Sequence, residues 1–76
     1  MRAIVLVSIE TGKDRDVLKA LRAIQGAKAN LVYGAYDAVV ELDRETDDEL
    51  KETVIGMRRI KGVNTTLTLR VQLLAP

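Results

Sequence analysis

The same short sequence pattern occurs twice in this chain, 36 positions apart, and it limits the folds that the chain can adopt. The segment Arg22 to Ala27 corresponds to the segment Arg58 to Val63. In each copy a helical stripe of apolar side chains ends at a glycine, and a strand-like segment follows. A strand–helix–strand unit therefore occurs twice. The resulting β-α-β-β-α-β order predicts an α+β, ferredoxin-like fold, with a four-stranded antiparallel sheet and two helices on one face.

Apolar periodicity predicts where these elements lie. The two helices are expected from Asp14 to Ile24 and from Thr46 to Ile60, and Thr46 with Glu49 forms a capping box at the start of the second. Gly56 inside that helix is expected to mark a close packing contact, since glycine costs about 1 kcal/mol there relative to alanine. Strands are expected over four apolar segments: Ala3 to Ile9, Ala27 to Tyr33, Ala38 to Leu42 and Val63 to Leu74.

With both helices on one face, the other face of the sheet has no cover. Ile4 and Leu6 are among the apolar residues that a monomer would expose there, and an uncovered apolar face indicates an interface. A chain of 76 residues is also small for an independent domain, because it buries only about 60–65% of its extended surface on folding. We therefore expect this single domain, residues 1–76, to be at least dimeric.

The residue types exclude several functions. The chain has neither cysteine nor histidine, so it lacks thiolate ligands, disulfides and the commonest general base. No acid and base are paired, and the acidic run Asp47 to Glu49 is typical of a helix N-terminus, so we expect no catalytic residue, no metal site and no enzyme activity. A net charge of +1 without a basic block argues against direct nucleic-acid binding. The apolar run near the N-terminus is too short to span a membrane, so a cytoplasmic protein is expected.

The segment Gly34 to Asp37 interrupts two apolar strand patterns and is the first candidate site. Glycine permits a sharp turn with approachable backbone N–H groups, and Asp37 supplies a carboxylate without an evident packing role. Backbone donors beside one carboxylate could hold a ligand with an anionic and a cationic end, such as an amino acid. A hairpin turn with a solvated aspartate is the alternative.

Thr66 and Thr68 are the second candidate site, because they share one face of the last predicted strand with Arg70 and Gln72. Hydroxyl groups on a rigid strand suit the recognition of a small polar ligand. The alternative is the ordinary preference of threonine for strands.

From about Ala3 to Val71 the chain resembles the C-terminal effector-binding domain, or RAM domain, of the Lrp/AsnC (feast/famine) transcriptional regulators. The resemblance lies in the order and spacing of several short segments rather than in any one of them. These segments are Glu10 to Lys13, Ile24 to Ala27, Tyr33 to Leu42, and Ile60 to Val63 followed by Thr66 and Thr68.

The resemblance implies a dimeric α/β-barrel type of subunit, in which two sheets pair face to face, and such dimers commonly assemble into tetramers of dimers. A free amino acid, with no other cofactor, would bind between dimers. Its carboxylate would lie on the backbone near Gly34 and Tyr36, its ammonium group on Asp37, and Thr66 or Thr68 of a neighbouring subunit would close the site. The implied site residues are Tyr33, Gly34, Ala35, Tyr36, Asp37, Thr66 and Thr68.

Regulators of this family carry an N-terminal helix-turn-helix, whereas this chain begins at the first strand of the effector domain. The resemblance therefore implies a stand-alone domain that acts in transcriptional regulation without binding DNA, and that could co-assemble with full-length Lrp/AsnC regulators. Two alternatives stay open. A dimeric α/β-barrel isomerase or monooxygenase would share the fold, although the chain lacks histidine and a paired acid and base. An ACT-like regulatory domain would also bind amino acids, but such domains usually place the ligand glycine after the first strand.

Overall fold

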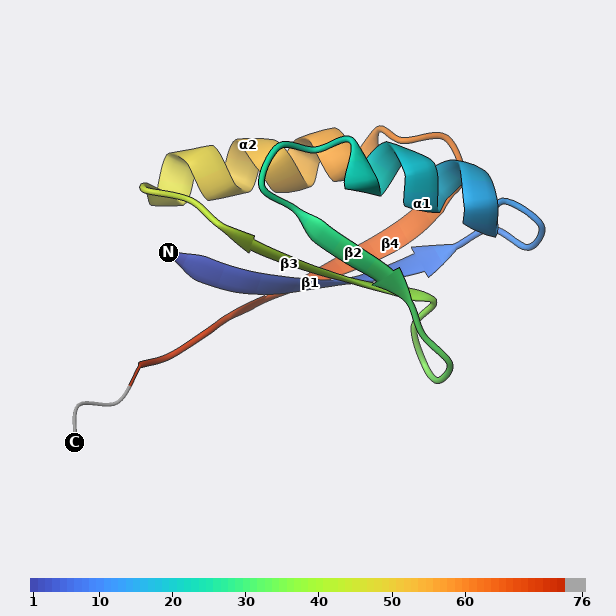
Figure 1. Cartoon of the computed structure of the whole chain (residues 1–76), viewed down its shortest axis with the longest axis horizontal. Coiled ribbons are helices and arrows are strands. Elements are labelled where there is room, and N and C mark those ends of the chain that lie inside the picture. The colour runs from blue at the N-terminus through green and yellow to red at the C-terminus, as the bar shows by residue number, and fades with distance from the viewer. Residues whose placement is uncertain (74–76) are drawn as a thin grey trace.

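The computed structural model of the chain describes residues 1–73, and in it two helices cover one face of a four-stranded sheet (Figure 1). The strands are antiparallel and lie side by side in the order β2-β3-β1-β4. This α+β architecture is the ferredoxin-like fold that the repeated pattern predicts, and the prediction is confirmed. The elements in chain order are β1 (Arg2–Ile9), α1 (Asp14–Arg22), β2 (Lys28–Leu31), β3 (Ala38–Asp43), α2 (Asp47–Arg58) and β4 (Val63–Arg70).

The core lies between the helices and the sheet and is built from aliphatic side chains. Every second residue of β1 is buried, and the facing positions of β3 are buried with them. Thr46 begins α2 as predicted, since its hydroxyl accepts a hydrogen bond from the Glu49 amide at 3.1 Å. The fully buried residues of largest volume come from both helices and from the two central strands: Leu21, Met57, Val5, Val7, Val17 and Val40.

Two strands are shorter than the sequence predicts. β2 ends at Leu31, and Tyr33 lies in the connection to β3. β4 ends at Arg70 because β1, its neighbour in the sheet, begins at Arg2, so within residues 1–73 the predicted continuation beyond Val71 has no strand to pair with. One further hydrogen bond joins the Val71 amide to the Arg2 carbonyl at 2.9 Å. Leu74, the predicted end of the strand, lies outside the described residues.

A glycine follows the helix in each copy of the repeat, and Gly62 shows why. Its φ of +103° lies in the left-handed region, and a Cβ at this position would come within 2.8 Å of Val17 Cγ2. Gly56 is different, because it is exposed on α2 and a Cβ there would meet nothing within 4 Å. The close packing contact predicted for Gly56 is therefore wrong within this subunit.

The sheet face opposite the helices is apolar. The pairing of β1 with β4 places Leu67 beside Leu6 and Leu69 beside Ile4, so these four residues share that face. Leu67 and Leu69 are each 45% exposed. The location of the uncovered face is thus as predicted, whereas the dimer that would cover it stays a prediction. Among residues 1–73, the structure contains no helix long and apolar enough to cross a membrane.

Candidate functional site

The connection between β2 and β3 forms the predicted turn. The Val32 amide donates a hydrogen bond to the Asp37 carbonyl at 2.9 Å, which closes the loop between them. Gly34 lies within this loop with a φ of +143°, a conformation that side chains strongly disfavour. A Cβ at Gly34 would meet nothing within 4 Å, so glycine is required here by backbone conformation and not by lack of space.

Asp37 is held firmly at the start of β3. Its amide donates to the Val7 carbonyl at 2.9 Å, and its Oδ2 accepts a hydrogen bond from the Ile9 amide at 2.7 Å. The backbone pairing of β3 with β1 ends at Ala38 and Val7. Beyond this pair, the Asp37 side chain takes the place of a backbone carbonyl and accepts the hydrogen bond from the Ile9 amide. Asp37 therefore takes part in the hydrogen bonding of the sheet, which the sequence did not indicate. Within residues 1–73 its Oδ1 has no hydrogen-bond partner.

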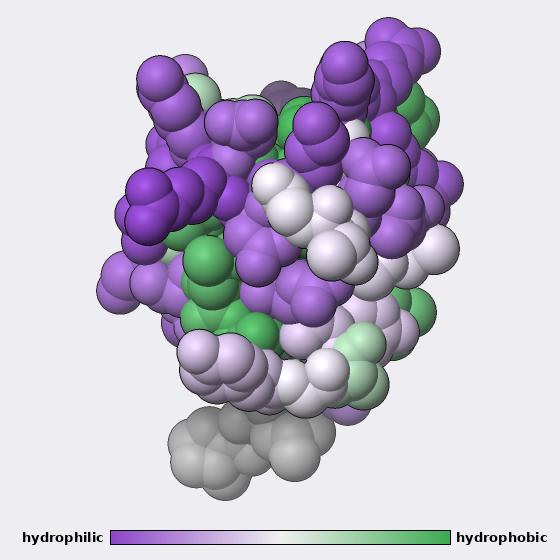
Figure 2. Space-filling view, turned by 90° about the vertical axis from the view of Figure 1, so that its right-hand side faces the viewer, coloured by the Kyte–Doolittle hydropathy of each residue, from purple (hydrophilic) through white to green (hydrophobic). Residues whose placement is uncertain are grey.

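A cavity of about 340 Å³ opens beside this carboxylate and is lined by Asp14, Leu31, Val32, Tyr33 and Asp37. Its volume is at the lower end of the range for small-molecule sites. We call it the turn cavity. Figure 2 looks onto this end of the molecule, where a small apolar area is bordered by hydrophilic side chains. Among the described residues, the charged groups that line the turn cavity are two carboxylates and no cation, so the cavity favours a cationic group such as an ammonium.

The residues that line the turn cavity differ from those of the predicted site. The cavity brings Tyr33 and Asp37 together, whereas Gly34, Ala35 and Tyr36 do not line it. Asp14, the first residue of α1, was missed by the sequence analysis. Its acidic side chain at a helix N-terminus is typical of helix capping and gave no separate signal.

Thr66 and Thr68 lie elsewhere in the subunit. They pair with Val7 and Val5, whose side chains are buried beneath the helices, so both threonines are on the helix-covered face. The Arg58 Nε donates a hydrogen bond to Thr66 Oγ1 at 2.9 Å. Strand β1 lies between β4 and the start of β3, so one subunit does not bring these threonines to Asp37. A contribution from a neighbouring subunit stays a prediction.

Solved structures similar to this chain include two small proteins of nearly the same length. The hypothetical protein PHS023 from Pyrococcus horikoshii is 29% identical, with a TM-score of 0.84, and the match covers 96% of this chain and 90% of that one. FFRP-DM1 is 28% identical with a TM-score of 0.84, and the match covers 90% of this chain and 93% of that one.

The chain also has the fold of half of a larger regulator. E. coli AsnC is 17% identical with a TM-score of 0.88, and the match covers 96% of this chain but 51% of AsnC. FFRP-DM1 and AsnC are Lrp/AsnC-family proteins, so structures of that family are among those that this chain resembles. No protein-family model and no curated protein sequence matches the chain.

Proposed function

We propose that this chain is a regulatory, ligand-binding module of the Lrp/AsnC type, which binds a free amino acid and assembles with copies of itself. The observation that carries the proposal is the Asp37 carboxylate. One of its oxygens is fixed by the Ile9 amide while the other has no partner within residues 1–73, beside a cavity of suitable size. A carboxylate held in place by one strong hydrogen bond is pre-organised to accept a second one from an ammonium group.

In the proposal, each group of such a ligand has its own place in or beside the turn cavity. The ammonium group lies against Asp37 Oδ1, with Asp14 adding negative charge, and an apolar side chain packs on Leu31 and Val32. Among the described residues, the lining offers the ligand carboxylate no cation. In this proposal the carboxylate takes the backbone N–H groups near Gly34 and Tyr36, and a neighbouring subunit closes the site with Thr66 or Thr68.

The uncovered sheet face is the surface through which we propose that copies of the chain assemble. Two copies pair through the apolar residues of β1 and β4, and such dimers associate further around the turn cavity. The partners are thus other copies of this chain and full-length Lrp/AsnC regulators that present the same face. The module acts without catalysis and without direct contact to DNA.

Calorimetric titration with each proteinogenic amino acid tests the proposal, and Asp37→Asn is the variant that isolates the charge. Asparagine retains an oxygen that can accept from the Ile9 amide, but it loses the negative charge that attracts an ammonium group. We expect Asp37→Asn to weaken binding by about tenfold to a hundredfold. Glu52→Gln, which removes one negative charge from the exposed surface of α2, is the control and should bind as the parent does. Equal affinity of the parent and Asp37→Asn would refute the assignment of Asp37.

A further inference from the structure

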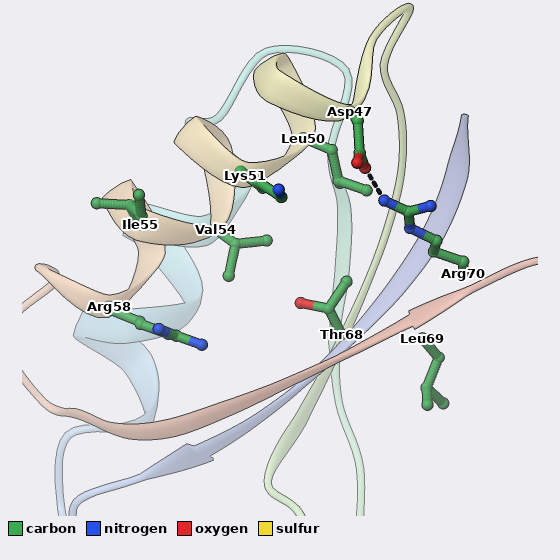
Figure 3. A pocket seen from close by; sticks show the side chains of 9 residues that line it. All are labelled: Asp47, Leu50, Lys51, Val54, Ile55, Arg58, Thr68, Leu69 and Arg70. Carbon is green, nitrogen blue, oxygen red and sulfur yellow. Dashed lines mark ion pairs between the residues drawn. The ribbon is translucent and has the colours of Figure 1, made fainter.

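A second and larger cavity, of about 650 Å³, lies between α2 and β4 (Figure 3). We call it the α2/β4 groove. Leu50 and Val54 of α2 and Thr68 of β4 face one another across it, and Ile55, which is 46% exposed, lies at its rim. Its volume is in the middle of the range for small-molecule sites, and its surface is predominantly apolar. The space can therefore hold a ligand with an apolar body.

The polar groups of the groove carry an excess of positive charge. Lys51, Arg58 and Arg70 contribute three positive charges and Asp47 contributes one negative charge, so the lining has a net charge of +2. The whole chain has a net charge of only +1. Arg70 is paired with Asp47 at one end of the groove (Figure 3). Among residues 1–73, neither Lys51 nor Arg58 forms an ion pair, so two cations remain uncompensated beside an apolar surface.

Arg58 is positioned to receive an anion. Its Nε is anchored on Thr66 Oγ1 at 2.9 Å, which holds the planar guanidinium across the space between α2 and β4 (Figure 3). An anchored guanidinium loses little rotational freedom on binding and presents its terminal N–H groups to both oxygens of a carboxylate. Lys51 is two helical turns earlier on the same face of α2 and adds to the positive field.

We infer that the α2/β4 groove binds a monocarboxylate with an apolar chain, such as an aliphatic carboxylic acid. The carboxylate lies on Arg58, with the Thr68 hydroxyl within the same groove, and the chain lies along Leu50, Val54 and Ile55. This site is separate from the turn cavity, since the two share no lining residue. Thr68 is the groove residue that the proposed amino-acid site also draws on, from a neighbouring subunit, so Asp37→Asn and Arg58→Gln are the variants that test the two sites separately.

Titration with octanoate, followed by amide chemical shifts and by calorimetry, tests the inference. We expect shifts at residues of α2 and β4, weaker binding of octan-1-ol and octylamine, and affinity that rises up to about fourfold for each added methylene that becomes buried. Arg58→Gln should weaken octanoate binding by about tenfold or more. Arg59→Gln removes the same charge from the exposed neighbouring residue, which does not line the groove, and should change affinity by less than about twofold.

A second variant keeps the test valid if Arg58→Gln alters the fold through the lost bond to Thr66. Ile55→Glu leaves that bond intact and introduces a carboxylate at the exposed rim. It should weaken octanoate binding and improve octylamine binding. Equal affinities for octanoate and octan-1-ol, or equal effects of Arg58→Gln and Arg59→Gln, would overturn the inference. So would octanoate binding that is lost in Asp37→Asn and unchanged in Ile55→Glu.

Discussion

Replacing Asp37 by alanine should destabilise the fold, because the carboxylate is part of the hydrogen bonding of the sheet. Its Oδ2 accepts from the Ile9 amide at 2.7 Å, and Ile9 is only 7% exposed. Alanine would leave that amide without its partner at a position where water has limited access. A hydrogen bond to a charged group contributes about 1.5–3 kcal/mol, and we expect a loss of stability in that range.

Asp37→Asn provides the matched comparison. Its amide oxygen can still accept from the Ile9 amide, so the loss should be limited to the difference between a charged and a neutral acceptor, about 1 kcal/mol. The free energy of unfolding of a domain is only about 5–15 kcal/mol, so both losses are measurable.

Urea unfolding followed by circular dichroism measures these differences. With a slope of about 1 kcal/mol per molar urea for a small protein, Asp37→Ala should lower the unfolding midpoint by about 1.5–3 M and Asp37→Asn by about 1 M. All variants must be compared at one protein concentration, since association would stabilise the folded state. A midpoint for Asp37→Ala equal to that of the parent, or of Asp37→Asn, would show that the bond to Ile9 contributes nothing and would refute the reasoning.

Three further predictions concern packing and assembly. Gly62→Ala should destabilise the protein by about 2–4 kcal/mol in urea unfolding, since its Cβ would clash with Val17 at a positive φ, and an unchanged midpoint would contradict this. Gly56→Ala should stabilise it by about 0.5–1 kcal/mol in the same assay, because the position is helical and open; a loss of stability would indicate a partner packed there. Leu67→Arg should dissociate the parent oligomer in light scattering, and a parent that is already an 8.4 kDa monomer at micromolar concentration would exclude the dimer.

The order of elements could be predicted from the sequence because it depends on local patterns. Helical stripes, a capping threonine and a glycine after each helix are all visible within a few neighbouring residues. The ends of the strands could not be predicted in the same way, because a strand continues only while it has a partner. The segment after Arg70 keeps its alternating pattern, yet β1 begins at Arg2, whose carbonyl accepts one further hydrogen bond from the Val71 amide.

In the candidate site, too, features that depend on neighbouring residues could be predicted, whereas contacts between residues far apart in the sequence could not. The turn at Gly34 follows from local chemistry, and the sequence located it. The hydrogen bond from Ile9 to Asp37 joins residues 28 positions apart, and no local pattern indicates it. Alternation shows that Thr66 and Thr68 share a face, but only the pairing with buried residues of β1 shows that this face is the one covered by helices.

The two cavities are related by the internal repeat of 36 positions. Each lies between a helix and an edge strand, α1 with β2 in the turn cavity and α2 with β4 in the groove. The shift of 36 positions carries three lining residues of the first onto three of the second, namely Asp14, Val32 and Tyr33 onto Leu50, Thr68 and Leu69. The charges that distinguish the cavities lie mostly outside these three pairs, in which Asp14 alone is charged. The second carboxylate of the turn cavity, Asp37, and the cations of the groove have no equivalent in the other lining. The charges of the two linings favour an ammonium group in the turn cavity and a carboxylate in the groove, although the repeat places both cavities between a helix and an edge strand.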